Sequence, residues 1–123
     1  MEFPNDRTYT ATHEWLQDDG SETTIGITDF AQASLGDLVF INLPEPGDEV
    51  VAGQAFADVE SVKSVSEIVS PVSGVVAEVN EDLLDSPELA NQNAYDAWFI
   101  KVDMVSETLE TFDADEYQAR FID

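Results

Sequence analysis

Short β-prone runs separated by closely spaced turn residues are the feature that most restricts the fold of this chain. The runs are rich in Val, Ile, Phe and Thr, and segments such as Pro-Gly or Ser-Gly lie between them. Many short strands joined by turns predict a mainly β sandwich or barrel. We expect strands at Thr23–Ile27, Val39–Leu43, Val50–Val51, Ala55–Val62, Val65–Val69, Val75–Val79 and Trp98–Val102.

A few short helices complete the predicted elements. Thr28 can cap a helix over Asp29–Leu35, and Gly36 can end it. The segment Ser86–Glu88 has the cap, the Pro at the first helical position and the early acid of another short helix. In the tail, residues about 104–123, apolar residues recur at helical spacing, which predicts a helical C-terminal extension.

The composition describes an acidic chain that nevertheless folds. The 123 residues include 27 Asp or Glu and 4 Lys or Arg, which gives a formal net charge of −23. Disordered acidic chains are poor in apolar residues, whereas this one is 43% hydrophobic and 10% aromatic. We therefore expect one domain over residues 1–123. The simplest account of the charge is a cytoplasmic protein from a salt-accumulating organism, because ~1 M salt shortens the Debye length to about 3 Å.

Several classes of function are excluded by the residues that are missing. With no cysteine, the chain has no thiolate nucleophile and no cysteine-based metal site, and its single histidine, His13, cannot form a multi-histidine site. Four cations are too few to neutralise a run of nucleic-acid phosphates. We also expect no membrane segment and no targeting signal, since the apolar runs are short and Met1–Asp6 carries no positive run.

One of the two lysines lies at a position that predicts exposure. The expected strands Ala55–Val62 and Val65–Val69 can pair about Val62-Lys63, which sets Val59 against Ser66 and makes a tight hairpin. Lys63 would then project into solvent from the hairpin tip. Pattern alone does not distinguish this residue from an ordinary surface lysine.

The tip is surrounded by two motifs, Glu60–Glu67 (ESVKSVSE) and Ser70–Gly74 (SPVSG). These motifs resemble the lipoyl-attachment region of the glycine cleavage system H proteins. The resemblance continues in His13–Trp15 (HEW), Ile25–Gln32 (IGITDFAQ) and Asn93–Val102 (NAYDAWFIKV), in the same order along the chain. Two departures, Ala94 and Ala97, stand where the family usually has Pro and Gly.

The resemblance implies a lipoyl/biotinyl-type barrel-sandwich hybrid with lipoic acid in amide linkage to Lys63. It implies a carrier and not an enzyme. In that role the lipoyl group takes an aminomethyl group from glycine decarboxylase (P-protein), delivers it to the aminomethyltransferase (T-protein) and is reoxidised by dihydrolipoamide dehydrogenase (L-protein). A lipoylating enzyme is the fourth expected partner, and we expect a monomer. The absence of cysteine agrees, because a cofactor can bring the sulfur atoms.

Other site residues are also assigned from the resemblance. Glu60, three residues before Lys63, is expected to help the lipoylating enzyme recognise the hairpin. Thr12, Glu14 and Glu67 are expected to line a cleft that receives the loaded arm. Carboxylate and hydroxyl oxygens are suitable acceptors for a protonated amine. His13 can orient Glu14, line the same cleft or serve structure alone.

Rival functions differ in how well they fit these residues. A biotinyl domain usually has methionines beside its lysine, whereas Val62 and Ser64 flank Lys63 here, and an outer lipoyl domain of a 2-oxoacid dehydrogenase is shorter. An H-like lipoyl donor in cofactor relay and an unmodified binding scaffold are both compatible with the sequence. Substitution of Lys63 by arginine distinguishes a carrier, which loses function, from a scaffold, which keeps partner binding.

Overall fold

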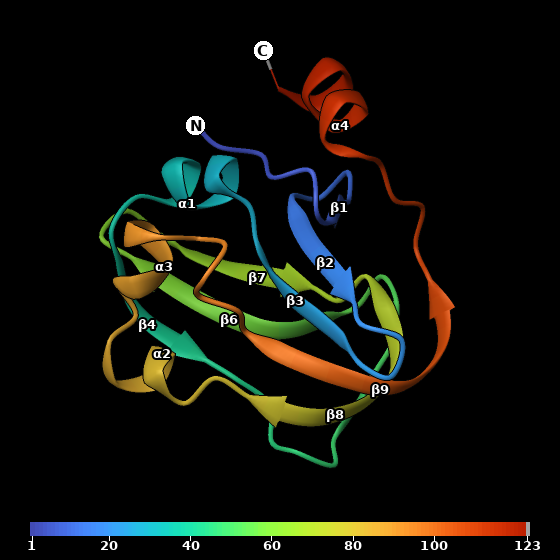
Figure 1. Cartoon of the computed structure of the whole chain (residues 1–123). Coiled ribbons are helices and arrows are strands. Elements are labelled where there is room, and N and C mark those ends of the chain that lie inside the picture. Colours follow the sequence, from blue (N-terminus) through green and yellow to red (C-terminus); the bar gives the residue numbers. More distant parts are fainter. Residues whose placement is uncertain (123) are drawn as a thin grey trace.

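The computed structural model describes residues 1–122 and is mainly β (Figure 1). Two antiparallel sheets make up most of it. The larger sheet has the strand order β1-β2-β3-β9-β8-β5, and the smaller has the order β4-β6-β7. The strands are β1 Thr8–Tyr9, β2 Glu14–Asp18, β3 Thr23–Ile27, β4 Leu38–Asn42, β5 Glu49–Val50, β6 Ala55–Ser61, β7 Val65–Val69, β8 Val72–Val79 and β9 Ile100–Thr108.

Four helices are attached to these sheets within the described residues: α1 Asp29–Leu35, α2 Asp82–Asp85, α3 Leu89–Gln92 and α4 Ala114–Phe121. Helix α4 lies at the same end of the molecule as β1 and the N-terminal segment (Figure 1). Two backbone hydrogen bonds between Tyr9 and Phe112 hold the segment before α4 against β1. The C-terminal helix is therefore fixed to the larger sheet near the start of the chain.

The hairpin β6–β7 has the predicted register. Ala57 pairs with Ile68, and Val59 pairs with Ser66. The side chains of Ala57, Val59 and Ile68 are buried. Because side chains alternate across a strand, this burial fixes which residues face solvent and leaves the tip between the two strands exposed.

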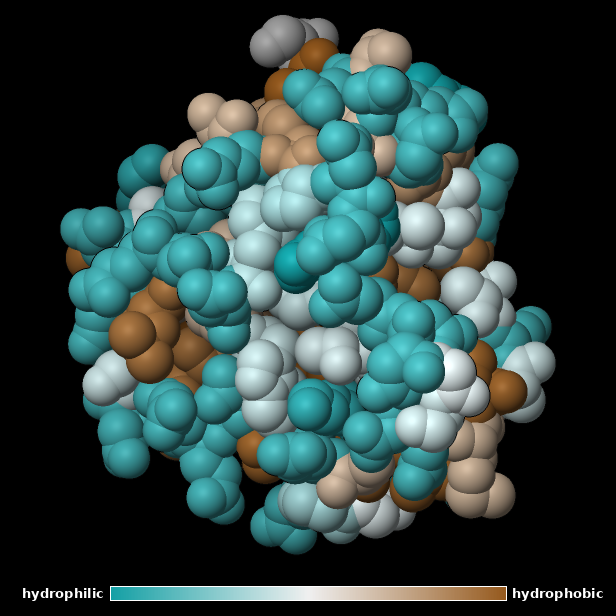
Figure 2. All heavy atoms as spheres, viewed as in Figure 1, coloured by the Kyte–Doolittle hydropathy of each residue, from teal (hydrophilic) through white to brown (hydrophobic). Residues whose placement is uncertain are grey.

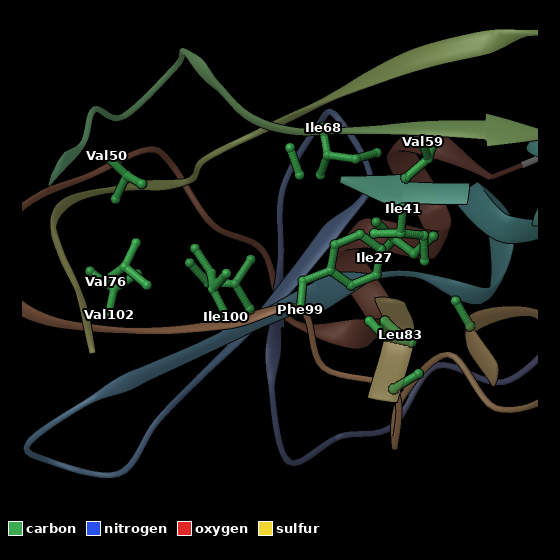
Figure 3. Packing of buried hydrophobic residues seen from close by; sticks show 14 of the residues in the cluster. Ile27, Ile41, Val50, Val59, Ile68, Val76, Leu83, Phe99, Ile100 and Val102 are labelled. Atoms are coloured by element: carbon green, nitrogen blue, oxygen red, sulfur yellow. The ribbon is translucent and has the colours of Figure 1, made fainter. Parts of the chain in front are cut away.

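The core between the sheets consists mainly of branched aliphatic side chains from many strands. Figure 3 shows Ile27, Ile41, Val59 and Ile68 packed with Phe99 at its centre. A second cluster of buried aromatics, including Tyr9, Trp15 and Tyr117, fills the space between α4, β1 and β2. The hairpin therefore rests on the first cluster, and the C-terminal helix rests on the second.

Helix α1 agrees with its predicted capping. The Thr28 hydroxyl accepts a hydrogen bond from the Ala31 N–H, and Gly36 ends the helix with φ of 85°. This left-handed backbone is favoured by glycine, which has no Cβ. The helix is consequently fixed at both ends by residues that the sequence identifies.

Several predicted boundaries are wrong. Residues 104–108 belong to strand β9, and the C-terminal helix begins only at Ala114; Asp123 lies outside the described residues. The segment Val72–Gly74 is the start of β8 and not a turn. The helix expected at Ser86–Glu88 begins at Leu89, because Glu88 is its N-cap. Helix α2 was not predicted.

The reason for the main error is that two β-bulges interrupt the pairing of β8 with β9. Met104, with φ of 53°, lies at one of them and is exposed. The bulge disturbs the alternation of buried and exposed residues that identifies a strand in sequence. The apolar residues at helical spacing, Leu109 with Phe112 and Tyr117 with Phe121, all lie after β9, so the predicted helix was extended too far toward the N-terminus.

Candidate functional site

Lys63 lies at the exposed tip of the β6–β7 hairpin, and the Ser61 side chain organises this tip. The Ser61 Oγ accepts hydrogen bonds from the backbone N–H groups of Lys63 and Ser64, both at 3.2 Å. The Ser61 N–H donates to the Ser64 carbonyl at 2.8 Å. The hairpin thus closes without the Asn-Gly sequence typical of tight turns, because a serine hydroxyl takes part in the turn.

The tip is also attached to the loop that follows α1. The Val62 N–H donates to the Asp37 carbonyl at 3.0 Å. The side chain of Lys63 passes over Gly36, where a Cβ would lie 3.3 Å from the Lys63 Cε. Glycine at this position therefore serves both the end of the helix and the close passage of the lysine stem.

Lys63 differs from the other cations of the chain. Arg7, Lys101 and Arg120 form ion pairs with Asp6, Glu78 and Glu116 respectively. Lys63 forms none within residues 1–122, although the chain is strongly acidic. Its amine is therefore available for a partner or for acylation.

Glu60 lies on the outer face of the smaller sheet. It pairs with Phe40 of β4 on one side and with Val65 of β7 on the other. Phe40 and Val65 are exposed, as is Val62 at the tip. Val62, although apolar, is exposed and therefore does not anchor the hairpin. Glu60 is presented to solvent together with these apolar side chains on the same part of the hairpin.

A hollow of about 190 Å³ lies beside the hairpin, and four segments line it. The turn between β1 and β2, with the first residue of β2, contributes Thr12–Glu14, β3 contributes Ile27, and β7 contributes Ser66–Ile68. Helix α1 forms the remaining wall with the following residues: Phe30, Ala31, Ser34 and Leu35. The structure thus brings Thr12, Glu14 and Glu67 together, although they are distant in sequence. We call this space the α1–β7 hollow.

Glu14 is the buried acid of this hollow, with a relative exposure of 3%. Its Oε1 accepts hydrogen bonds from the hydroxyls of Thr10 at 2.7 Å and Thr12 at 2.6 Å. Burial raises the pKa of Glu14 above its ordinary value, and the two hydroxyls oppose this effect. Because both hydroxyls meet Oε1, Oε2 has no hydrogen-bond partner within residues 1–122 and can accept one from a ligand.

Glu67 and Thr12 are exposed, in contrast to Glu14. Glu67 pairs with Asp58 across the hairpin and borders the hollow from β7. The acids therefore differ in depth: Glu14 lies inside the hollow and Glu67 at its rim. A cation that entered would pass one carboxylate and reach the other.

His13 occupies a left-handed position in the turn between β1 and β2, with φ of 73°. Such a residue commonly ends a three-residue hairpin loop, and His adopts this backbone more readily than most residues do. Its Nδ1 lies 2.6 Å from the Tyr117 hydroxyl, and its ring lies against Phe30 with centroids 4.6 Å apart. Burial lowers the pKa of His13, so its imidazole is neutral near pH 7.

Helix α1 connects Lys63 to the hollow. The lysine stem lies against Gly36 at the C-terminal end of the helix, and Ala31 lines the hollow. At 1.5 Å of rise per residue, these two positions are about 7.5 Å apart along the helix axis. A chain of roughly ten single bonds attached to Lys63 extends on the order of 10 Å or more. Such an arm is long enough to follow α1 into the hollow.

Comparison with known proteins identifies the family. The family model described as "Glycine cleavage H-protein" matches residues 7–122. The chain belongs to the glycine cleavage H-protein family. A "Glycine cleavage system H protein" from Lachnoclostridium phytofermentans is 52% identical over 111 residues, which cover 89% of this chain and 87% of that protein. One from Treponema denticola is 50% identical over 118 residues, covering 96% and 97%.

A solved structure gives the same result for the fold. The crystal structure of a glycine cleavage system H protein from Mycobacterium marinum matches with a TM-score of 0.89 and 38% sequence identity. The match covers 96% of this chain and 98% of that one. The expected fold class, a mainly β barrel-sandwich hybrid with short helices and a C-terminal helix, is confirmed.

Sequence reasoning missed several residues of this H-protein family member. Thr10 was not singled out, yet it is buried and bonded to Glu14. Phe30 and Ser34 had no assigned role and line the hollow. Tyr117 is 104 residues from His13, and nothing in the local pattern places the two side chains together. Of these residues only Thr10 could have been found from the sequence, because it lies two residues before Thr12 and four before Glu14.

Among residues 1–122, no group of three or more His, Cys, Asp or Glu side chains is arranged to hold a metal ion. None of the helices in this part of the chain has the length and apolar character needed to cross a membrane. Trp15 is buried in the aromatic cluster and not at the hollow.

Proposed function

We propose that this chain is the lipoyl carrier of a glycine cleavage system, with lipoic acid attached to Lys63. Its membership of the H-protein family supports this role, and so do the names of its relatives. The observation that carries the assignment to Lys63 is its position: an exposed lysine, without an ion pair in residues 1–122, at a hairpin tip held by Ser61 and Asp37.

The tip suits an attachment point because the Lys63 side chain is exposed while the strands that carry it are held in place. The strands behind it are anchored by Val59 and Ile68, which are buried in the core. Lys63 itself can therefore enter a partner's active site while the hairpin keeps its shape. When attached, a lipoyl group supplies a reversible disulfide that accepts and returns a one-carbon amine and two electrons.

The residues of this protein bind the amine carried on the arm and protect it. A protonated amine carried on the arm would meet Glu67 at the rim and Glu14 inside the α1–β7 hollow. Thr10 and Thr12 donate to Oε1 of Glu14, which leaves Oε2 able to accept a hydrogen bond from the amine. A cationic amine also favours the ionised form of Glu14, which burial disfavours when the hollow is empty. Binding of the amine thus stabilises the charge that the empty hollow disfavours.

Glu60 is proposed as a recognition residue for the lipoylating enzyme. It shares the outer face of the smaller sheet with the exposed residues Phe40 and Val65, and all three lie close to Lys63 in the strand register. A charged side chain between two apolar ones offers a partner both an ion-pairing group and a contact surface. Glu60→Gln should therefore slow lipoylation without changing the fold.

The partners proposed for the carrier are the P-, T- and L-proteins together with the lipoylating enzyme. In this proposal the protein acts in the cytoplasm and performs no catalysis of its own. The partners carry out the decarboxylation, the transfer to folate and the reoxidation. The residues of this chain hold and deliver the cargo between them.

The decisive experiment uses the only two lysines of the chain. The protein is produced with lipoate and a lipoylating enzyme, and the intact mass and a peptide map are measured. The wild type and Lys101→Arg should each gain one lipoyl group, located on Lys63. Lys63→Arg should gain none and should lose all turnover with the L-protein. Modification at Lys101, or glycine cleavage supported by Lys63→Arg, would refute the proposal.

A further inference from the structure

The hydroxyl of Tyr117 in α4 joins two walls of the α1–β7 hollow. It lies 2.6 Å from Nδ1 of His13, in the turn that carries Thr12 and Glu14. It also lies 3.0 Å from Oγ1 of Thr28, the residue that caps α1. A backbone bond from the Thr28 N–H to the His13 carbonyl, at 3.0 Å, links the same two segments.

These contacts form one directed chain of hydrogen bonds when His13 is neutral. The Ala31 N–H donates to the Thr28 hydroxyl. That hydroxyl can donate to the Tyr117 oxygen, and the Tyr117 hydroxyl can then donate to Nδ1 of His13. Each hydroxyl in the chain both donates and accepts, so the positions of α1 and the turn depend on each other through Tyr117.

Helix α4 holds the Tyr117 ring firmly. The side chain is fully buried and stacks on Tyr9 with ring centroids 4.9 Å apart. Phe3 contacts the same ring edge-on, at 5.7 Å between centroids. Asp113 caps the helix by accepting a hydrogen bond from the Glu116 N–H at 2.8 Å. Apolar packing alone would be served equally well by phenylalanine, so the hydroxyl needs a separate explanation.

We propose that Tyr117 is a positioning residue for the loaded arm, and that α4 acts as a clamp on the hollow. By bonding His13 and Thr28 together, its hydroxyl fixes the distance between α1 and the turn that presents Thr12 and Glu14. This inference rests on the proposed function, because it takes the loaded lipoyl arm to be the ligand of the α1–β7 hollow. It assigns the C-terminal helix a part in protecting the cargo.

The test compares two tyrosines of the same aromatic cluster. Tyr117→Phe removes only the hydroxyl between the two walls. Tyr9→Phe is the matched control, because the Tyr9 hydroxyl donates to the Pro4 carbonyl and contacts neither wall. Both variants retain their rings in the buried cluster. We expect both to be lipoylated at Lys63 as the wild type is.

The first measurement follows loss of the cargo to water. The lipoylated proteins are loaded with the aminomethyl group by the P-protein and glycine and are then separated from it. Loss of the cargo to water consumes one water and breaks the carbon–sulfur and carbon–nitrogen bonds, which gives a thiol, formaldehyde and ammonium, and formaldehyde is measured over time. Because the hydroxyl that bonds to both walls is lost, Tyr117→Phe should release formaldehyde about fivefold faster than the wild type. Tyr9→Phe should release it at the wild-type rate.

The second measurement needs no cofactor. In the unmodified protein, the His13 imidazole nitrogens and the backbone amides of residues 12–14 are observed by NMR. Tyr117→Phe should shift the Nδ1 resonance and speed amide exchange in this turn. Tyr9→Phe should leave both unchanged, although it lies in the same cluster.

The outcomes separate this inference from the proposed function. Glu14→Gln serves as a reference, because it alters the acid of the hollow directly. If Glu14→Gln releases formaldehyde at the wild-type rate, the hollow is not the site of the arm and the proposed role of Glu14 fails. If Glu14→Gln is faster but Tyr117→Phe is not, the clamp is refuted. If Tyr9→Phe accelerated formaldehyde release equally, any change in the aromatic cluster would loosen the hollow, and the clamp would also be refuted.

Discussion

At the scale of single residues, Glu14 shows the conflict between stability and function most clearly. A buried carboxylate is destabilised by loss of water, which raises its pKa. The hydroxyls of Thr10 and Thr12 reduce this cost but meet only one of its two oxygens. The protein therefore places a carboxyl group where the empty hollow compensates its ionised form only in part.

This conflict predicts a pH-dependent effect of Glu14→Gln on stability. The folded-state pKa of Glu14 is raised, so the free energy of unfolding falls as pH rises from the unfolded pKa through the folded one. Glutamine has a similar shape and does not ionise. The variant should therefore melt at a higher temperature than the wild type at pH 8, and this gain should shrink toward pH 4.

Thermal unfolding followed by circular dichroism across that pH range measures the effect. Glu60→Gln is the matched control, because it removes one charge from an exposed strand position. A gain equal to that of Glu60→Gln would mean that only net charge matters, and would contradict the role assigned to burial of Glu14.

At the scale of elements, the β6–β7 hairpin shows how a side chain can replace a turn sequence. Ser61 Oγ accepts two backbone N–H groups at the tip, from Lys63 and Ser64. Ser61→Ala removes this acceptor and should cost about 1 kcal/mol of local stability. Amide exchange at Lys63 and Ser64 should accelerate in hydrogen-exchange mass spectrometry, while the strands remain protected.

The same tip provides the control for that experiment. Ser64→Ala leaves the backbone groups of residue 64 in place, and these are the groups that bond to Ser61. It should therefore leave the exchange rates at the tip unchanged. Equal acceleration in both variants, or none in Ser61→Ala, would show that the Ser61 hydroxyl does not organise the tip.

Elements defined by local signals were predictable from the sequence. The register of β6–β7 follows from alternation, because Val59 and Ile68 must both face the core. Helix α1 follows from its caps, Thr28 and Gly36. The end of β9 did not follow, because its bulges interrupt the alternation on which the prediction depends.

The sequence predicted only those site residues that belong to recognisable motifs. Lys63 and the group Thr12, Glu14 and Glu67 came from the family resemblance, and the structure places the last three at one hollow. The contact of Tyr117 with His13 depends instead on where α4 packs. That packing is set by a buried aromatic cluster whose members are separated in sequence, so local patterns do not reveal it.

At the scale of the whole molecule, the excess of negative charge is the dominant feature of the surface. Hydrophilic residues cover most of the visible face, and hydrophobic residues show between them in separate patches, one of them on the left, where β4 and α2 lie in Figure 1 (Figure 2). The 27 acids face only 4 cations, and the ion pairs within residues 1–122 are Asp6–Arg7, Glu78–Lys101 and Glu116–Arg120. The acid of each pair is exposed, and ion pairs at the surface contribute little to stability. The remaining acids repel one another, and this repulsion acts against the folded state.

Added salt should therefore stabilise this protein, whereas it would weaken a fold held by surface ion pairs. Raising KCl from ~0.01 M to ~1 M shortens the Debye length from about 30 Å to about 3 Å and screens the repulsion. Each kcal/mol of repulsion removed should raise the melting temperature by about 4 °C in a chain of this length.

Melting curves across a KCl series test this prediction, and the shape of the response identifies its cause. Screening depends on ionic strength and levels off once the Debye length is short, so chloride and sulfate should act alike at equal ionic strength. Strengthened apolar burial would instead continue to grow and would favour sulfate. A melting temperature that is the same in millimolar and molar KCl would show that the acidic surface does not limit the stability of the fold.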